Sequence, residues 1–253
     1  VQRRIANTLR RAERLRQIRR QANQLTSKII QSVFLKMFGD PIVNPKRWDV
    51  KTIEEVASRE SNAIRAGPFG SSLKKETYVK KGYKVYGQEQ VIPDDLTIGD
   101  YYISANRYKE LEKYKIQAGD ILISLVGTFG KVSVVPDSFE PGIINPRLIK
   151  LTVDKSIVLP IFVKHVLTSD AMRKELERSS HGVTMGIINL SILKKVKILV
   201  PPLSLQTQFA MIVDRIRRMY AAQVQSTQEI NELFHSLMQK AFRGELRLEK
   251  RQN

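Results

Sequence analysis

Few side chains in this 253-residue sequence could catalyse a reaction. Cysteine is absent, which excludes disulfides, thiolate metal sites and a cysteine nucleophile. None of the three histidines, His165, His181 and His235, has a helical partner four residues away or a nearby thiol with which it could hold a metal ion. The G-x-x-x-x-G-K-[ST] loop that cradles ATP phosphates is also missing. These residue types favour a protein that binds its target over one that reacts with it.

Two acidic pairs, Glu54-Glu55 and Asp94-Asp95, are the remaining candidates for catalysis. A nuclease centre needs a further acidic residue and a Glu-x-Lys element, and no such array accompanies either pair. We therefore predict that these carboxylates are solvated charges at turns and helix starts.

A surplus of basic residues gives the sequence its binding chemistry. It has 43 Lys and Arg against 25 Asp and Glu, a formal net charge of +18, and a pI of about 10.1. Such a charge makes nucleic acid the default partner. The charge is uneven, because residues 1–40 carry +8 and residues 206–253 carry +3, which leaves +7 for the centre.

The central loops combine the groups that contact DNA phosphates and base edges. In the loop Gly67–Leu73, glycines let backbone N–H groups approach phosphate, serines donate hydrogen bonds, and Lys74-Lys75 add charge. The alternative is a structural turn in which Phe69 is buried. The segment Gln88–Gln90 follows an expected strand and suits adenine or cytosine edges, with a plain solvent loop as the alternative.

Further DNA contacts are predicted in a tight hairpin and at Arg107, Arg147 and Thr184. The hairpin Gly127–Lys131 places a hydroxyl and an ammonium where both could face phosphate. Tyr78, Tyr83 and Tyr86 are interpreted as core residues instead. The complete set of predicted DNA contacts is Ser71, Ser72, Lys74, Lys75, Gln88, Gln90, Arg107, Thr128, Lys131, Arg147 and Thr184.

These loops must be positioned by a β-rich centre, from about Trp48 to Leu203, in which short β-type runs alternate with glycine-containing turns. We predict helices at Pro160–Thr168 and Asp170–Arg178, with Asp170 as N-cap of the second. Pro201-Pro202 separates this centre from the last helix. The predicted strands are Lys84–Tyr86, Tyr101–Ile103, Asp120–Ser124, Lys131–Val135 and Leu148–Leu151.

Both ends of the chain have the pattern of long helices. In each, apolar residues recur at steps of three and four along one narrow stripe. Gly39 and Pro41 end the first helix, and Gly244 ends the last. A stripe of about nine turns favours a coiled coil over two ordinary surface helices packed on a core, which is the alternative.

The two ends also repeat each other, which places the centre between copies of one helical element. A shift of 204 residues aligns nine identities in 37 ungapped positions. Both copies end in Ser-x-x-x-Lys-x-Phe, at Ser32–Phe38 and Ser236–Phe242.

The centre resembles the target-recognition domain of type I restriction–modification DNA specificity subunits. Each motif is weak alone, but seven occur in order. One departure is that Ser204-Leu205 replace the acidic residues usual before the glutamine. The motifs are Gly67–Leu73, Gly119–Ser124, Gly127–Lys131, Asn145–Arg147, His181–Met185, Val200–Gln206 and Gln239–Leu246.

The resemblance implies an α+β fold: a globular mixed α/β target-recognition domain flanked by two long helices that form a coiled coil. Residues 1–40 would be the first helix, 41–203 the recognition domain, 204–246 the second helix and 247–253 a basic tail. The chain looks like a half-subunit or the C-terminal half of a two-domain subunit. It would read one half of a bipartite target in double-stranded DNA and dock modification (methyltransferase) subunits through its helices.

The resemblance also implies that this chain is no enzyme, because other subunits of such a complex methylate adenine and cleave DNA. S-adenosylmethionine, ATP and magnesium would bind those partners, which include an ATP-dependent restriction subunit. The two Asn-Pro pairs fit this expectation, since neither Asn44-Pro45 nor Asn145-Pro146 continues into the Asn-Pro-Pro-aromatic loop of an adenine methyltransferase.

Other readings of the sequence remain open. One is a sequence-independent nucleic-acid-binding coiled-coil adaptor. The arginines of the first helix either form a surface that meets methyltransferase subunits or DNA, or are a solvated coiled-coil face that covers the apolar seam. A homodimer through the helices would present two identical readers. We expect a cytoplasmic bacterial or archaeal protein without membrane contact, because arginines interrupt the first apolar residues and no apolar run approaches about 18 residues.

Overall fold

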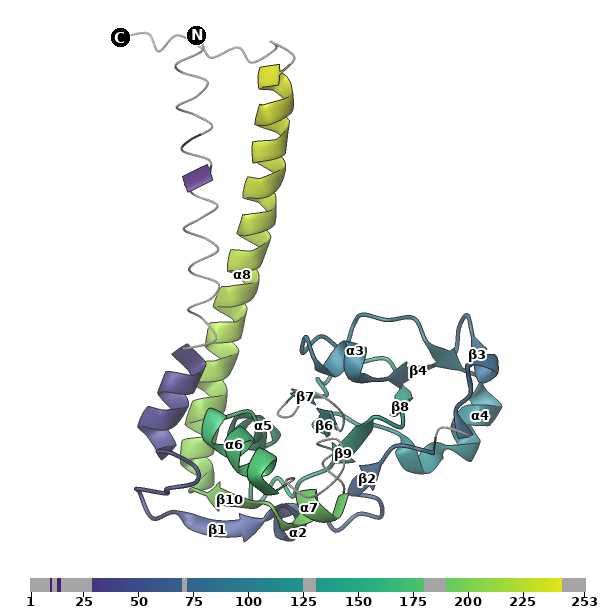
Figure 1. The fold of residues 1–253 in the computed structure, drawn as a ribbon, viewed down its shortest axis with the longest axis vertical. Coiled ribbons are helices and arrows are strands. Elements are labelled where there is room, and N and C mark those ends of the chain that lie inside the picture. Colours follow the sequence, from purple (N-terminus) through teal and green to yellow (C-terminus); the bar gives the residue numbers. More distant parts are fainter. Residues whose placement is uncertain are drawn as a thin grey trace. The chain divides into compact units, whose positions relative to one another are not determined.

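The computed structural model describes residues 10, 13, 14, 29–69, 72–124, 131–179 and 190–242. The chain divides into two compact units (Figure 1). The terminal unit comprises Val1–Val33 and Met211–Asn253, and the central unit comprises Phe34–Ala210. All strands of the described residues belong to the central unit, as does every predicted DNA contact.

The terminal unit is helical wherever it is described. Helix α8 (Leu203–Phe242) is 40 residues long; it starts in the central unit and continues through the terminal unit. Residues 29–38 are also helical. This helix ends where the sequence predicts, because Gly39 adopts φ +83° and its N–H donates to the Leu35 carbonyl at 2.8 Å. The predicted supercoil and the tail 247–253 stay predictions.

The central unit contains one two-stranded and two four-stranded sheets. In the smallest sheet, β1 (Asp49–Thr52) pairs antiparallel with β10 (Lys197–Val200). These two strands come from near the start and near the end of the sequence of the central unit. The first four-stranded sheet has the order β2-β9-β6-β7. Its strands are β2 (Ile64–Ala66), β6 (Ile121–Ser124), β7 (Val132–Val134) and β9 (Leu148–Leu151).

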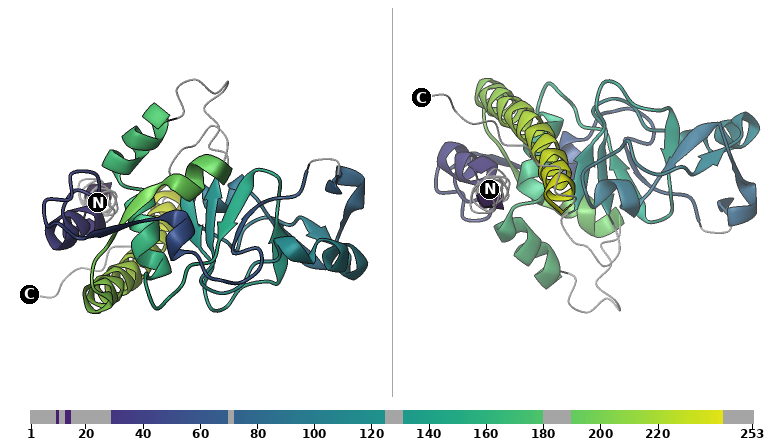
Figure 2. Two further views of the ribbon diagram at one scale, coloured as in Figure 1. Left: turned by 90° about the horizontal axis from the view of Figure 1, so that it is seen from below. Right: turned by 90° about the horizontal axis from the view of Figure 1, so that it is seen from above.

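The second four-stranded sheet has the order β3-β5-β4-β8 and mixes both pairings, since β4 and β8 are parallel. Figures 1 and 2 show this sheet at the end of the central unit that lies away from β1 and β10. Its strands are β3 (Tyr78–Val79), β4 (Tyr83–Tyr86), β5 (Tyr102–Ile103) and β8 (Gly142–Ile144). The fold is thus mixed α and β, as predicted.

Short helices join these strands, and two longer ones match the prediction. Helix α5 (Pro160–Leu167) and helix α6 (Asp170–Ser179) occupy the predicted segments. The predicted N-cap was wrong by one residue, because the Ser169 hydroxyl accepts from the Met172 N–H at 3.2 Å and Asp170 is already helical. The short helices are α2 (Ile53–Val56), α3 (Gln88–Val91), α4 (Ala105–Glu110), α7 (Leu190–Lys195), η2 (Lys75–Thr77) and η3 (Glu112–Tyr114).

An aromatic cluster packs the helices of the central unit together. Phe34 and Phe38 come from the helix at residues 29–38, Phe162 from α5 and Phe209 from the start of α8. Phe38 lies 4.9 Å from Phe162 and 5.5 Å from Phe209 between ring centroids, both edge-to-face. All four side chains are at most 2% exposed. This cluster therefore joins residues 34–38, α5 and the start of α8 within the central unit.

Candidate nucleic-acid interface

The turn Asn145–Arg147 connects β8 to β9 and therefore links the two four-stranded sheets. The Asn145 N–H donates to the Tyr86 carbonyl at 2.8 Å, which ties the turn to β4. The Asn145 side-chain oxygen accepts from the Arg147 N–H at 2.9 Å, an Asx turn that fixes the local backbone. The Arg147 side chain is exposed at this point.

Two glycines allow neighbouring segments to approach this turn. A Cβ atom on Gly67 would lie 1.8 Å from the Asn145 carbonyl oxygen, and one on Gly87 would lie 2.5 Å from the Asn145 amide nitrogen. At Gly67 the neighbour is backbone, so a larger residue would force the two segments apart, whereas at Gly87 the Asn145 side chain would have to move. Glycine at these positions therefore brings the loop after β2 and the start of α3 to the same turn.

The loop after β2 is held on both sides. The Gly67 N–H donates to the Leu148 carbonyl at 2.9 Å, and the Ser72 N–H donates to the Phe69 carbonyl at 2.8 Å. The Arg107 guanidinium donates to the Ser72 carbonyl and also pairs with Glu110. Two predicted DNA contacts, Ser72 and Arg107, therefore meet although 35 residues separate them.

Gln88 and Gln90 differ in their surroundings. Gln88 donates its side-chain amide to the Ser124 hydroxyl at 2.7 Å, and this contact joins α3 to the end of β6. Gln90 is 0% exposed, its oxygen accepts from the Gly87 N–H at 2.8 Å, and its nitrogen donates to the Ile98 carbonyl at 3.1 Å. Gln90 thus shapes the start of α3, and its amide does not face solvent.

The β6–β7 hairpin begins beside Gln88. The Ser124 N–H donates to the Lys131 carbonyl at 3.0 Å, and the Lys131 side chain is exposed. The predicted contact Thr128 lies in the chain between Ser124 and Lys131 and outside the described residues. The predicted contacts Ser71 and Thr184 also lie outside the described residues. Lys74 is exposed, and Lys75 begins η2.

The structure therefore connects five predicted contacts through one turn. We call the residues linked in this way the Asn145 cluster. A series of hydrogen bonds and close approaches links the members to the turn. The loop after β2 and the start of α3 approach the turn directly, whereas Arg107 is linked through the Ser72 carbonyl and Lys131 through Ser124 and Gln88. Its members are Phe69, Ser72, Gln88, Arg107, Lys131 and Arg147.

Sequence reasoning did not identify the residues that hold this cluster in place. In the sequence, Asn145 stands out only as part of a motif, and Tyr86 only as an expected core residue. Tyr86 is 0% exposed, and its hydroxyl donates to the Glu140 carbonyl at 2.6 Å. The triplet Asn-Pro-Arg is a signal from which this turn is predictable, since Asn and Pro both favour turns.

A buried cation stabilises the sheet behind the cluster. Lys84 is 1% exposed and donates to Glu140 at 2.7 Å and to the Thr97 carbonyl at 2.9 Å. This hydrogen bond from Lys84 lowers the pKa of the Glu140 carboxyl, and Tyr102 adds a second hydrogen bond. The pair ties β4 to the segment that precedes β8.

A second buried pair lies in the other four-stranded sheet. Asp120 and Lys150 are 3.8 Å apart and almost completely buried. Burial raises the pKa of the Asp120 carboxyl, although the Thr152 hydroxyl and the Lys150 ammonium offset part of the effect. Burial likewise lowers the pKa of Lys150. Asp120 also accepts from the Gln117 N–H at 2.9 Å, so its role is structural.

The acidic pairs are placed largely as predicted. Glu54 and Glu55 lie in the first turn of α2, where Thr52 and Glu55 form a capping box. Asp95 accepts from Thr97 in a turn. Asp94 departs from a purely solvated charge, because it accepts from Ser133 at 2.8 Å and pairs with Lys164 of α5.

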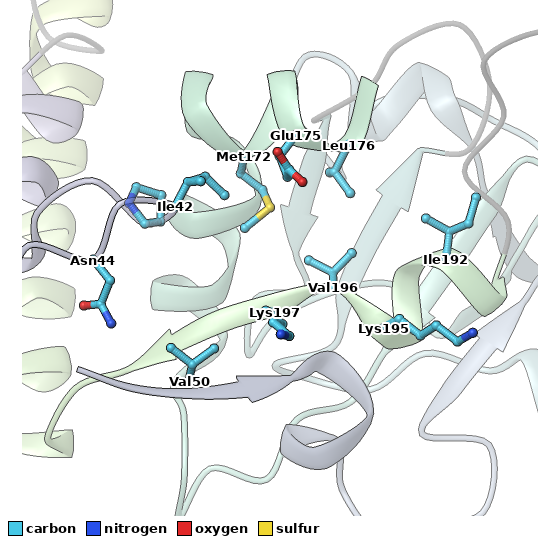
Figure 3. A pocket seen from close by; sticks show the side chains of 11 residues that line it. Ile42, Asn44, Val50, Met172, Glu175, Leu176, Ile192, Lys195, Val196 and Lys197 are labelled. Atoms are coloured by element: carbon cyan, nitrogen blue, oxygen red, sulfur yellow. The ribbon is translucent and has the colours of Figure 1, made fainter. Parts of the chain in front are cut away.

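A pocket of about 440 Å³ and another of about 790 Å³ lie elsewhere in the central unit. In the larger one, Met172 and Leu176 of α6 face Val196 and Lys197 (Figure 3). Neither pocket is lined by a member of the Asn145 cluster. Among the described residues, no group of three or more acidic or histidine side chains could hold a metal ion. None of the described helices is both long and apolar enough to cross a membrane.

Comparison with known proteins gives a consistent result. The model of the family "Type I restriction modification DNA specificity domain" matches residues 45–232. The Type I restriction enzyme EcoBI specificity subunit of Escherichia coli is 28% identical over 144 residues, which are 54% of this chain and 30% of that protein. A putative type I restriction enzyme MjaX specificity subunit of Methanocaldococcus jannaschii is 23% identical over 203 residues, 78% of this chain and 46% of that protein.

Solved structures show the same fold. The HsdS subunit from Thermoanaerobacter tengcongensis aligns with a TM-score of 0.59 at 22% identity, covering 96% of this chain and 57% of that chain. A chain from a study of complex assembly and conformational transition of the type I R-M system aligns with a TM-score of 0.66 at 21% identity. The alignment covers 96% of this chain and 58% of that chain. The chain spans 30% and 46% of the length of these two curated relatives, which is less than half of each.

Proposed function

We propose a DNA-reading role for this chain, which belongs to the family of type I restriction modification DNA specificity domains. It would recognise one half of a bipartite target in double-stranded DNA. The observation that carries the proposal is the Asn145 cluster, in which basic, amide and hydroxyl groups from four separate segments are held around one turn. Duplex recognition needs this combination of phosphate and base-edge contacts.

The members of the cluster suit different parts of the DNA. Arg147 and Lys131 are exposed cations, which can hold phosphates, and arginine can also read guanine. The Gln88 amide is oriented by Ser124 and can read adenine. Lys74, Lys75, Ser71, Thr128 and Thr184 remain proposed contacts. Gln90 supports Gln88 in this proposal, because its amide is used inside the protein.

The partners follow from the family and the long helices. The chain would dock modification subunits through α8 and the helix at residues 29–38, and the assembly would include an ATP-dependent restriction subunit. Catalysis, with S-adenosylmethionine, ATP and magnesium, would belong to those partners and not to this chain. The complex would act in the bacterial or archaeal cytoplasm, where its DNA lies. Pairing of two copies through the helices would give one reader for each half of an inverted repeat.

Selection from a randomised duplex pool tests the proposal. The chain is assembled with its modification subunits, and bound duplexes are recovered over several rounds. We expect one short consensus for each copy of the chain, lost when the sequence is scrambled. Enrichment of no sequence would refute DNA reading. It would favour the sequence-independent adaptor, whose phosphate contacts do not discriminate between duplexes.

A further inference from the structure

Phe69 has the largest exposed fraction, 85%, among the exposed large apolar side chains of the described residues. The interpretation of the loop as a turn with this ring buried is therefore wrong. The preceding Pro68 is buried, and Leu73 at the other end of the loop is 7% exposed. Apolar residues thus anchor the loop on both sides while the ring between them faces solvent.

The described residues on either side of the ring are bound to neighbouring segments. Its first end is fixed by the Gly67 N–H, which donates to Leu148, and by the close approach of Gly67 to Asn145. At the second end, the Ser72 N–H donates to the carbonyl of Phe69 itself, and Arg107 binds the Ser72 carbonyl. A side chain that is presented on an anchored backbone loses little freedom when it binds a partner.

The surroundings of Phe69 indicate which part of DNA it would meet. The rest of the Asn145 cluster is polar or cationic and suits phosphates and base edges. A phenyl ring gains nothing from a phosphate. In an undistorted duplex, the apolar group on the major-groove edge is the C5-methyl group of thymine. The ring could instead insert between base pairs, but insertion unstacks the DNA and costs free energy. A contact with a thymine methyl group leaves the base pairs stacked and has no such cost.

We propose that Phe69 is a specificity-determining residue that contacts the methyl group of a thymine in the major groove. The inference rests on the proposed function. The Phe69 contact would add one apolar interaction with a base to the Asn145 cluster, whose other members suit phosphates and the hydrogen-bonding groups of bases. At its contact position the chain would discriminate thymine from cytosine and from uracil.

Replacement of single thymines by uracil tests this contact, because it removes one methyl group and leaves base pairing intact. The chain, assembled with its modification subunits, is titrated with the selected duplex and with each single uracil variant. We expect one substitution to weaken binding about fourfold, the value for one buried methyl-sized group. Phe69→Ala should weaken binding to the thymine duplex to a similar degree and bind both duplexes equally. Phe69→Leu should keep part of the preference.

Val43→Ala is the matched control, since Val43 is an apolar residue with 73% exposure in the segment before β1. It should leave both affinities unchanged, and all variants should unfold at the wild-type temperature. The inference is overturned if no uracil duplex binds more weakly, or if Phe69→Ala keeps the wild-type preference. It is also overturned if 2-aminopurine fluorescence shows unstacking that depends on Phe69. A failure of the pool selection is a separate result, which refutes the proposed function and this inference with it.

Discussion

Two glutamines that are two residues apart have different tasks in this molecule. The Gln88 amide is oriented by the Ser124 hydroxyl at the edge between the two large sheets. The Gln90 side chain is buried and completes the backbone hydrogen bonding of Gly87 and Ile98. Both are Gln in the sequence, and burial distinguishes Gln88, the proposed reader, from Gln90, which supports the start of α3.

Alanine substitutions should separate these tasks. Gln88→Ala should weaken binding to the selected duplex by roughly 1–3 kcal/mol, the value for a lost amide–base contact, without changing the free energy of unfolding. Gln90→Ala should lower the free energy of unfolding by about 1–3 kcal/mol, because it leaves buried groups without partners. Competition binding and urea unfolding measure the two effects. A Gln88 variant that binds normally would remove this residue from the proposed interface.

Lys131 tests the phosphate contacts. Lys131→Ala should weaken binding to selected and scrambled duplexes equally and reduce the slope of log affinity against log salt by about 1. Lys197→Ala is the control, because Lys197 is exposed on β10 and outside the Asn145 cluster. Salt titrations of both variants measure the slope. If the two lysines have the same effect, Lys131 has no particular phosphate contact.

At the scale of elements, periodicity identified the strands that pair within a short stretch of the chain. The apolar run at Asp120–Ser124 and the run at Lys131–Val135 became β6 and β7. Strands β1 and β10 were missed, although they pair along all four residues, because 148 residues separate Asp49 from Lys197. Strand β8 was missed because it has only three residues and begins with glycine.

The candidate site was predictable as a list of residue types and not as an arrangement. Ser72 and Arg107 were both expected to contact DNA, but the sequence did not indicate that Arg107 binds the Ser72 carbonyl. The role of Asn145 as the common neighbour depends on backbone approaches at Gly67 and Gly87. Such approaches depend on tertiary packing, which local propensity does not contain.

Gly67→Ala should disrupt the site through its element. The added Cβ would lie 1.8 Å from the Asn145 carbonyl oxygen, so the loop and the turn must move apart. We expect the free energy of unfolding to fall by roughly 1–3 kcal/mol, as for other overpacked sites, and selective binding to fall with it. Thermal unfolding and duplex titration measure both. Wild-type affinity in a normally folded variant would show that the Gly67 approach does not position the readers.

The Lys84–Glu140 pair predicts a pH dependence. The pKa of Glu140 is lowered below its ordinary value of about 4.5 by the Lys84 hydrogen bond. A lowered carboxyl pKa adds stability that is fully present above the unfolded-state value and is lost as the pH falls through the folded-state value. The difference in stability between wild type and Glu140→Gln should therefore be largest near pH 7 and shrink below about pH 4.5.

The magnitude of this effect is limited by solvent. Removing one partner of a fully buried pair costs roughly 3–5 kcal/mol. Glu140 is 50% exposed on its side chain, and Lys84 keeps the Thr97 carbonyl, so about 1–2 kcal/mol is expected here. Urea unfolding at pH 7 and at pH 3.5 measures it. A variant whose deficit does not change with pH would contradict the assignment.

At the scale of the whole molecule, the net charge of +18 has two separate uses in this account. The share in the central unit includes Lys131 and Arg147, which are proposed to contact DNA, whereas the share in the long terminal segments is proposed to serve the docking of other subunits. The relatives are more than twice as long as the segment they share with this chain, as expected if one such unit reads half of a target.

The most direct test of the account is the ratio of two dissociation constants at one salt concentration. The chain is bound to its modification subunits, and its affinity is measured for the selected duplex and for a scrambled duplex of equal length and composition. We expect the affinity for the selected duplex to be about 10³-fold or more above that for the scrambled duplex, as for other sequence-specific proteins. A ratio near one would contradict it, since the Asn145 cluster would then hold DNA only by its charge.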